Sequence, residues 1–96
     1  MINVLVTIEV KDFNSLTAFE TEAVKIMSSY NARMITAFET QRNDDGTGQE
    51  VHLLEFPDEL SFSNYRSDRR FNTLTDLREK AINSIEVISS RVLKLY

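Results

Sequence analysis

Two charged side chains stand among apolar neighbours in the second half of the sequence. Glu55 comes near the end of the strand-like run VHLLEF, and Arg78 lies within a stripe of apolar residues at helical spacing. Residues at this spacing share one face of a helix, so the stripe predicts that Arg78 points toward the core. The stripe consists of Leu74, Leu77, Arg78, Ala81, Ile82 and Ile85. A guanidinium in that position needs either a partner or a cavity.

The chemistry of this pair takes one of two forms. The Glu55 carboxylate and the Arg78 guanidinium could form an ion pair that fixes helix against strand, and loss of either partner would then be costly. Alternatively, Arg78 holds the carboxylate or enolate oxygen of a ligand. Tyr65 follows Phe62 by three residues and should reach the same interior, where a buried tyrosine hydroxyl usually finds a hydrogen-bond partner.

His52 is the only histidine of the chain. A lone histidine without further nitrogen or sulfur ligands makes a poor metal site, and a general base needs a group that orients it. The sequence also has no glycine-rich phosphate loop and no nucleophile elbow. We therefore predict no metal and no cofactor, and assign His52 no catalytic role.

Composition and charge exclude several classes of protein. With 96 residues and 42% apolar content, the chain is expected to form a single domain over residues 1–96. Zero cysteines exclude disulfides, thiolate metal sites and cysteine nucleophiles. A net charge of −4, without the stacking aromatics of RNA-recognition domains, disfavours nucleic-acid binding. The sequence shows no membrane span and no signal peptide, so we expect a cytoplasmic protein.

Positive charge is concentrated in the last third of the chain. Residues 1–60 carry eleven acids against four bases, whereas residues 61–96 carry four acids against seven bases. These bases either cover a solvated helix face, balanced by nearby acids, or form an anion-attracting rim that includes Arg66 and Arg69.

Hydrophobic periodicity predicts the element order βαββαβ with a broken second helix. The predicted elements are a strand at 2–10, a helix that ends near 30, strands at 32–42 and 50–56, a short helix to 67, a second helical piece at 72–83, and a strand at 85–95. Asp12 or Asn14 caps the first helix, Asn31 ends it in a left-handed conformation, and Asp58 caps the second. Both glycines lie in the predicted turn at 43–49, where positive φ is favoured. With right-handed crossovers, this order gives a ferredoxin-like α+β fold with a four-stranded antiparallel sheet.

The predicted strands are apolar on both sides. One set of positions holds Val4, Val6, Ile8, Met34, Phe38, Val51 and Leu53. The other set holds Leu5, Ile35, Ala37, Leu54, Phe56, Ile88 and Val92. Helices cover only one face, and an uncovered apolar face exceeds what a monomer usually exposes. We therefore predict a homodimer that associates through its sheet faces.

Several segments carry a family resemblance: Glu55-Phe56-Pro57, the run YRSDRRF at 65–71, Leu77-Arg78 and Ala81-Ile82. They resemble an uncharacterised conserved family of the dimeric α+β barrel superfamily, related to the antibiotic-biosynthesis monooxygenases. The resemblance implies a small pocket between sheet and helices lined by Glu55, Tyr65 and Arg78. The chain departs from the family pattern at Asn31-Ala32, where a glycine pair is common, and at Arg70, which stands before the aromatic Phe71.

The resulting expectation is a homodimeric α+β barrel of unknown activity that binds a small organic acid, through Glu55, Tyr65 and Arg78, without a cofactor. The alternative is a cofactor-independent monooxygenase or isomerase that acts on a small aromatic or polyketide-like acid. The sequence leaves open whether the protein is an enzyme. The chain has neither a Trp nor a His on a predicted helix, and the related haem-degrading and quinone-forming proteins often use these residues.

Overall fold

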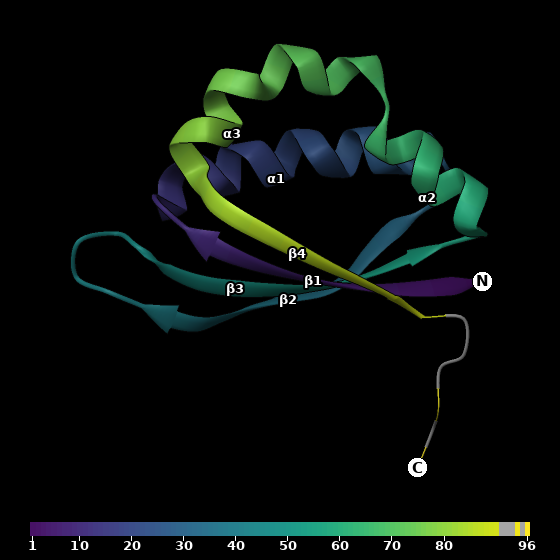
Figure 1. The fold of residues 1–96 in the computed structure, drawn as a ribbon, viewed down its shortest axis with the longest axis horizontal. Coiled ribbons are helices and arrows are strands. Elements are labelled where there is room, and N and C mark those ends of the chain that lie inside the picture. Colours follow the sequence, from purple (N-terminus) through teal and green to yellow (C-terminus); the bar gives the residue numbers. More distant parts are fainter. Residues whose placement is uncertain (91–93, 95) are drawn as a thin grey trace.

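The computed structural model describes residues 1–90, 94 and 96, and arranges them in two layers (Figure 1). The elements are β1 (Ile2–Val10), α1 (Phe13–Ser28), β2 (Arg33–Arg42), β3 (Gly48–Phe56), α2 (Glu59–Arg66), the 3-10 helix η1 (Arg69–Leu74), α3 (Thr75–Ala81) and β4 (Ile82–Ser90). The four strands form an antiparallel sheet in the order β2-β3-β1-β4, and the helices cover one of its faces. The predicted ferredoxin-like α+β fold is confirmed. No helix in the described residues is long and apolar enough to cross a membrane.

Strand register decides which residues the helices cover. Val4 pairs with Leu54 and Val6 pairs with His52, so these four side chains share the helix-covered face. Val51 and Leu53, with Phe38 beside Val51, therefore point to the opposite, open face, and the predicted grouping of these three residues with Val4 is wrong. Leu54 and Phe56, predicted to share a face with Leu5, lie on the covered face instead. Sequence alternation defines two faces within each strand, but it does not define the register between strands. Val92, predicted for one of these sets, lies outside the described residues.

Helix ends follow local side-chain chemistry as predicted. The Asp12 carboxylate accepts a hydrogen bond of 3.0 Å from the Ser15 backbone N–H and caps α1. The Asp58 carboxylate caps α2 in the same way, with 2.7 Å to the Ser61 N–H. Asn31 adopts φ 56° just beyond α1, which confirms the left-handed stop. Each of these features involves residues close in sequence, so the local pattern was sufficient to find it.

The segment after η1 differs from the predicted second helical piece. The helix ends at Ala81, and Ile82 and Ile85 belong to β4, where they pair with Val10 and Ile8. Backbone pairing with β1 places Ile82 and Ile85 in the sheet, where β-branched side chains are favoured, although their spacing also fits a helix. Arg78 is correspondingly exposed on α3, so the prediction that it points into the core is wrong. The predicted end of this strand falls largely on residues outside those described.

The two glycines serve different purposes. Gly46 has φ 87° in the turn between β2 and β3, as predicted. Gly48 instead opens β3, where a Cβ atom would collide with the Gln41 carbonyl and come within 2.9 Å of the Phe13 ring. Its placement in the turn is therefore corrected. The absent side chain allows β2 and α1 to approach β3 closely at this end of the sheet.

Candidate functional site

A cavity of about 590 Å³ lies between the helix layer and the covered face of the sheet. Its walls are mainly apolar and come from both layers, with Phe19 and Met27 on α1 opposite Leu54 and Val87 on the strands. The polar side chains that line it are Glu20, His52, Tyr65, Arg66 and Arg78. Apolar walls with a few convergent polar groups are typical of small-molecule sites.

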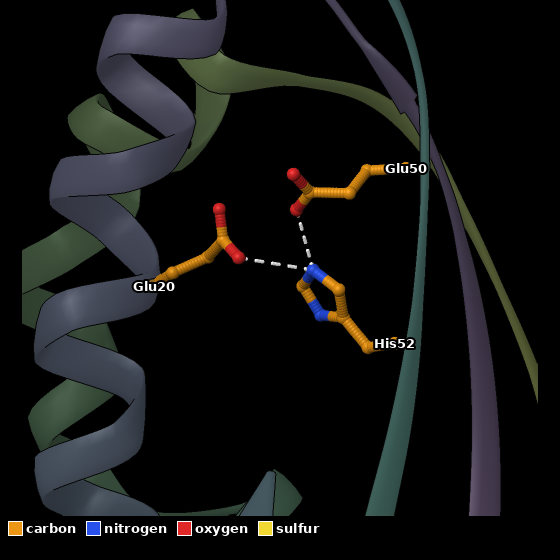
Figure 2. Close-up of side chains that lie close together, drawn as sticks. All are labelled: Glu20, Glu50 and His52. Carbon is orange, nitrogen blue, oxygen red and sulfur yellow. Dashed lines mark hydrogen bonds and ion pairs between the residues drawn. The ribbon is translucent and has the colours of Figure 1, made fainter. Parts of the chain in front are cut away.

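Three side chains converge beside this cavity, and two of them, Glu20 and His52, line it (Figure 2). The His52 Nε2 atom lies 2.6 Å from Glu50 Oε2 and 3.0 Å from Glu20 Oε2. Glu50 and His52 are two residues apart on β3, so both point to the covered face and are buried. Glu20 faces them from α1, four residues after the buried Leu16 and three before the buried Ala23. We call Glu20, Glu50 and His52 the carboxylate–histidine cluster.

Burial and charge act in opposite directions on His52. Burial disfavours the imidazolium and lowers the pKa of His52, but the hydrogen bonds and negative charges of Glu20 and Glu50 outweigh it. The pKa of His52 is therefore raised. The pKa of Glu50 is also raised, chiefly because burial disfavours its charged form and also because Glu20 lies nearby. Glu50 and His52 thus hold their protons more strongly than the same groups in water.

Such a cluster supports two kinds of chemistry. A histidine beside a carboxylate can accept a proton from a bound molecule, as in general-base catalysis. Alternatively, the imidazole nitrogen and two carboxylate oxygens can together ligate a divalent cation, because their three donor atoms all lie within 4.8 Å of one another.

The predicted site residues do not all meet at the cavity. Tyr65, Arg66 and Arg78 line it. Arg69 is exposed and is not among the lining residues. Glu55 points to the open face of the sheet, where its carboxylate forms an ion pair of 3.1 Å with Arg33 on β2. The structure therefore does not bring Glu55 and Arg78 together, because strand alternation places the carboxylate on the side away from the helices.

Tyr65 reaches the interior at the end of the cavity nearest α2. Its ring centroid lies 5.2 Å from those of Phe56 and Phe71, and the T-shaped contact with Phe71 is a favourable aromatic geometry. Burial raises the pKa of Tyr65 to about 12, so the hydroxyl stays protonated at neutral pH. The Arg66 guanidinium lies 5.4 Å from the Phe62 ring centroid, at the same end.

Sequence reasoning discounted His52 for want of a partner and passed over Glu20 and Glu50. The signal within β3 was available, since Glu50 and His52 are two residues apart in a predicted strand and must share a face. Glu20 was a second signal, because it lies at helical spacing from the apolar residues Leu16 and Ala23 of the first helix. That the helix face and the strand face meet at these positions follows only from the tertiary structure.

Comparison with solved structures defines the class of this protein. An uncharacterised NIPSNAP domain protein from Burkholderia xenovorans matches with a TM-score of 0.67 and 18% identity, over 97% of this chain and 95% of that one. SnoaB, a cofactor-independent oxygenase from Streptomyces nogalater, matches with a TM-score of 0.70 and 6% identity, over 98% and 94%. A protein of unknown function from Rhodopseudomonas palustris matches with a TM-score of 0.75 and 13% identity, over 98% and 83%. At these identities the likeness shows the fold alone, which is a ferredoxin-like α+β fold.

Within that class, the family is also defined. Residues 3–90 match the model of the DUF1330 family, described as a domain of unknown function, and the chain belongs to this family. No curated protein sequence matches the chain. The resemblance found in the sequence is thus confirmed.

Proposed function

We propose that this protein is a homodimer that binds a small, largely apolar organic acid in the cavity between its helices and its sheet. The observation that carries the proposal is the cavity itself, which combines apolar walls with two arginines, Arg66 and Arg78. Its volume of about 590 Å³ lies within the range of small-molecule sites, roughly 300–1,000 Å³.

The arginines favour an anionic group on the ligand. Within the described part of the chain, no ion pair involves Arg78, so its guanidinium is available to a carboxylate. A bidentate contact from Arg78 would orient the acid, while its apolar part would pack against Phe19 and Leu54. The carboxylate–histidine cluster, two of whose members line the same cavity, would repel a second negative charge. We therefore favour a monocarboxylic acid over a dicarboxylic acid.

The open face of the sheet supports the homodimer. Leu5 pairs with Leu53 on one side and with Ile88 on the other, and Phe38 pairs with Val51. These side chains form an apolar surface across the four strands, on the face that the helices leave uncovered. Phe38 on the edge strand β2 is 52% exposed and Ile88 on the opposite edge strand β4 is 51% exposed, so large apolar side chains are uncovered from one edge of this face to the other. A second copy of the same face would bury them.

Ligand binding is tested by a thermal-shift screen of small aromatic and aliphatic monocarboxylic acids and phenols against the wild-type protein. A bound acid raises the melting temperature according to its saturation. Arg78→Gln should abolish the shift, whereas the matched control Arg69→Gln should retain it, because Arg69 does not line the cavity. The proposal fails if no acid shifts the wild type, or if the two variants lose the shift equally.

The homodimer is tested by light scattering at micromolar concentration. We expect the wild type to have twice the mass of one chain, and Phe38→Lys/Ile88→Lys to have the mass of one chain. Val24→Lys/Leu60→Lys is the matched control, because these exposed apolar residues lie on α1 and α2 rather than on the open face. A monomeric wild type would overturn this part of the proposal.

The cofactor-independent monooxygenase or isomerase stays a prediction. Likeness of fold to SnoaB at 6% identity does not carry an activity, because one fold supports many reactions.

A further inference from the structure

We propose that Glu20, Glu50 and His52 bind one divalent transition-metal cation at the wall of the cavity. Two ligands come from β3 and one from α1, so the cation would join the sheet to the helix layer. The inference goes beyond the binding of an organic acid and does not depend on it.

The donor atoms converge on one point and lie slightly closer together than ligands of a shared cation. Carboxylate oxygens and imidazole nitrogens lie about 2.0–2.2 Å from Zn²⁺, so two ligand atoms of a tetrahedral site are about 3.3–3.6 Å apart. The Nε2 atom of His52 lies 3.0 Å from Glu20 Oε2 and 2.6 Å from Glu50 Oε2. These separations would therefore have to widen by roughly 0.3–1 Å to admit the metal.

Both carboxylates approach the same ring nitrogen (Figure 2). A single N–H group can direct one strong, linear hydrogen bond, so one of the two carboxylates is left with a poorly aligned contact. A base oriented for proton transfer would instead use one ring nitrogen for the carboxylate and the other for the substrate. A cation at the point where the three atoms converge satisfies both carboxylates and the nitrogen lone pair together.

The charge of the cluster also favours a cation. Two carboxylates face each other with one imidazole between them, and Glu50 and His52 are 8% and 5% exposed. In the described residues, neither carboxylate forms an ion pair with a lysine or an arginine. Buried carboxylates are costly unless they are paired or coordinate a metal, and a divalent ion neutralises both.

The donor set indicates which metals fit. One imidazole nitrogen with two carboxylate oxygens suits Zn²⁺, Mn²⁺ or Fe²⁺, whereas Ca²⁺ takes six to eight oxygen ligands that this wall does not supply. Three protein ligands beside a cavity leave at least one coordination position open toward it, as in catalytic rather than structural metal sites. A water molecule in the cavity would complete the coordination.

The test uses the full chain without a histidine tag, stripped with a chelator, and titrated calorimetrically with Zn²⁺ and Mn²⁺ in the absence of any organic acid. We expect one ion to bind per chain. Glu20→Gln keeps the shape of the side chain and should weaken binding about tenfold or more. Glu22→Gln is the matched control, because Glu22 lies on the same helix but forms an exposed ion pair with Lys25 and should bind metal as the wild type does.

A second measurement needs no variant of a buried residue. Zinc bound at Nε2 should shift the ¹⁵N resonances of the His52 side chain, which are unambiguous because the chain has one histidine. The inference is overturned if the wild type takes up neither Zn²⁺ nor Mn²⁺, if Glu22→Gln weakens binding as much as Glu20→Gln, or if the His52 resonances do not respond. Because the titration contains metal and no organic acid, a negative result would overturn the metal site without bearing on the proposal of acid binding.

Discussion

The two faces of the sheet differ in a way that ordinary amphipathic patterning does not predict. On the covered face, β3 places Glu50 and His52 under the helices, among Val6, Ile8 and Leu54. On the open face, the alternate residues of the same strand are Val51 and Leu53, beside the exposed Phe38 and Ile88. In the middle of β3, polar residues are thus inside and apolar residues outside.

The residue types on the two faces of β3 therefore have different physical reasons. The apolar residues of the open face are accounted for if a second copy covers them, as we propose. The polar residues of the covered face do not stabilise the fold, because the free-energy cost of removing them from water is only partly offset by their hydrogen bonds. We infer that the covered face is shaped by the cavity as well as by the core.

The largest expected effect compares one phenylalanine from each face. Phe56 is fully buried, with its ring centroid 5.0 Å from that of Phe62, so Phe56→Ala should lower the free energy of unfolding by about 3–5 kcal/mol. Phe38→Ala should instead weaken association, so its cost should grow with protein concentration. Urea unfolding at several protein concentrations measures both, and equal, concentration-independent losses would remove the distinction between the faces.

The second prediction concerns the carboxylate–histidine cluster in the metal-free protein. His52→Leu alone should destabilise the fold by about 3 kcal/mol, because it leaves the buried carboxylate of Glu50 and the half-buried carboxylate of Glu20 without their partner. Replacing all three polar residues, as Glu20→Met/Glu50→Met/His52→Leu, should restore the stability or raise it above the wild type by up to about 4 kcal/mol. Chemical denaturation compares the three proteins. A triple variant less stable than His52→Leu would show that the cluster exists for stability.

A smaller effect tests how tightly the covered face is packed near the hairpin. Gly48→Ala should destabilise the protein by about 1–3 kcal/mol, because the new Cβ atom collides with the Gln41 backbone and presses on Phe13. Gln49→Ala changes the next residue, whose side chain points to the open face, and should stay within about 0.5 kcal/mol of the wild type. Thermal melts of the two variants are sufficient, and similar melting temperatures would contradict the close approach.

The smallest effect concerns the helix layer above the covered face. Hydrogen bonds from Arg70, and then from the Tyr30 hydroxyl, hold the pKa of Asp68 well below its ordinary value of 3.8. A lowered pKa in the folded state stabilises the protein above pH 4, and this contribution is lost as the pH falls further. Asp68→Asn should therefore melt below the wild type at pH 7, and the difference should shrink below pH 4. A difference that is independent of pH would reject this role of the carboxylate.

The outline of the fold was predictable because its signals are local. The caps at Asp12 and Asp58 and the left-handed Asn31 each depend on neighbouring residues, and the alternation of residues 2–10 is enough to define a strand. The start of β4 was predicted at residue 85 rather than at residue 82, because Ile82 fits both a helical stripe and a strand. Pairing with β1, which is distant in sequence, selected the strand.

The residues of the candidate site were likewise predicted only in part from the sequence. Tyr65 and Arg78 were predicted to line a pocket, from a family resemblance, and they do line the cavity. Glu55 was assigned to the same pocket, but alternation and register send it to the open face beside Arg33.

From the sequence alone follow the elements, their order, the caps and the two-sided apolar character of the strands, because these depend on residues a few positions apart. The meeting of Glu20 with Glu50 and His52, and the separation of Glu55 from Arg78, were decided only by the tertiary structure. Register between strands and the docking of α1 on β3 depend on contacts across the whole chain, and periodicity within one segment carries no information about them.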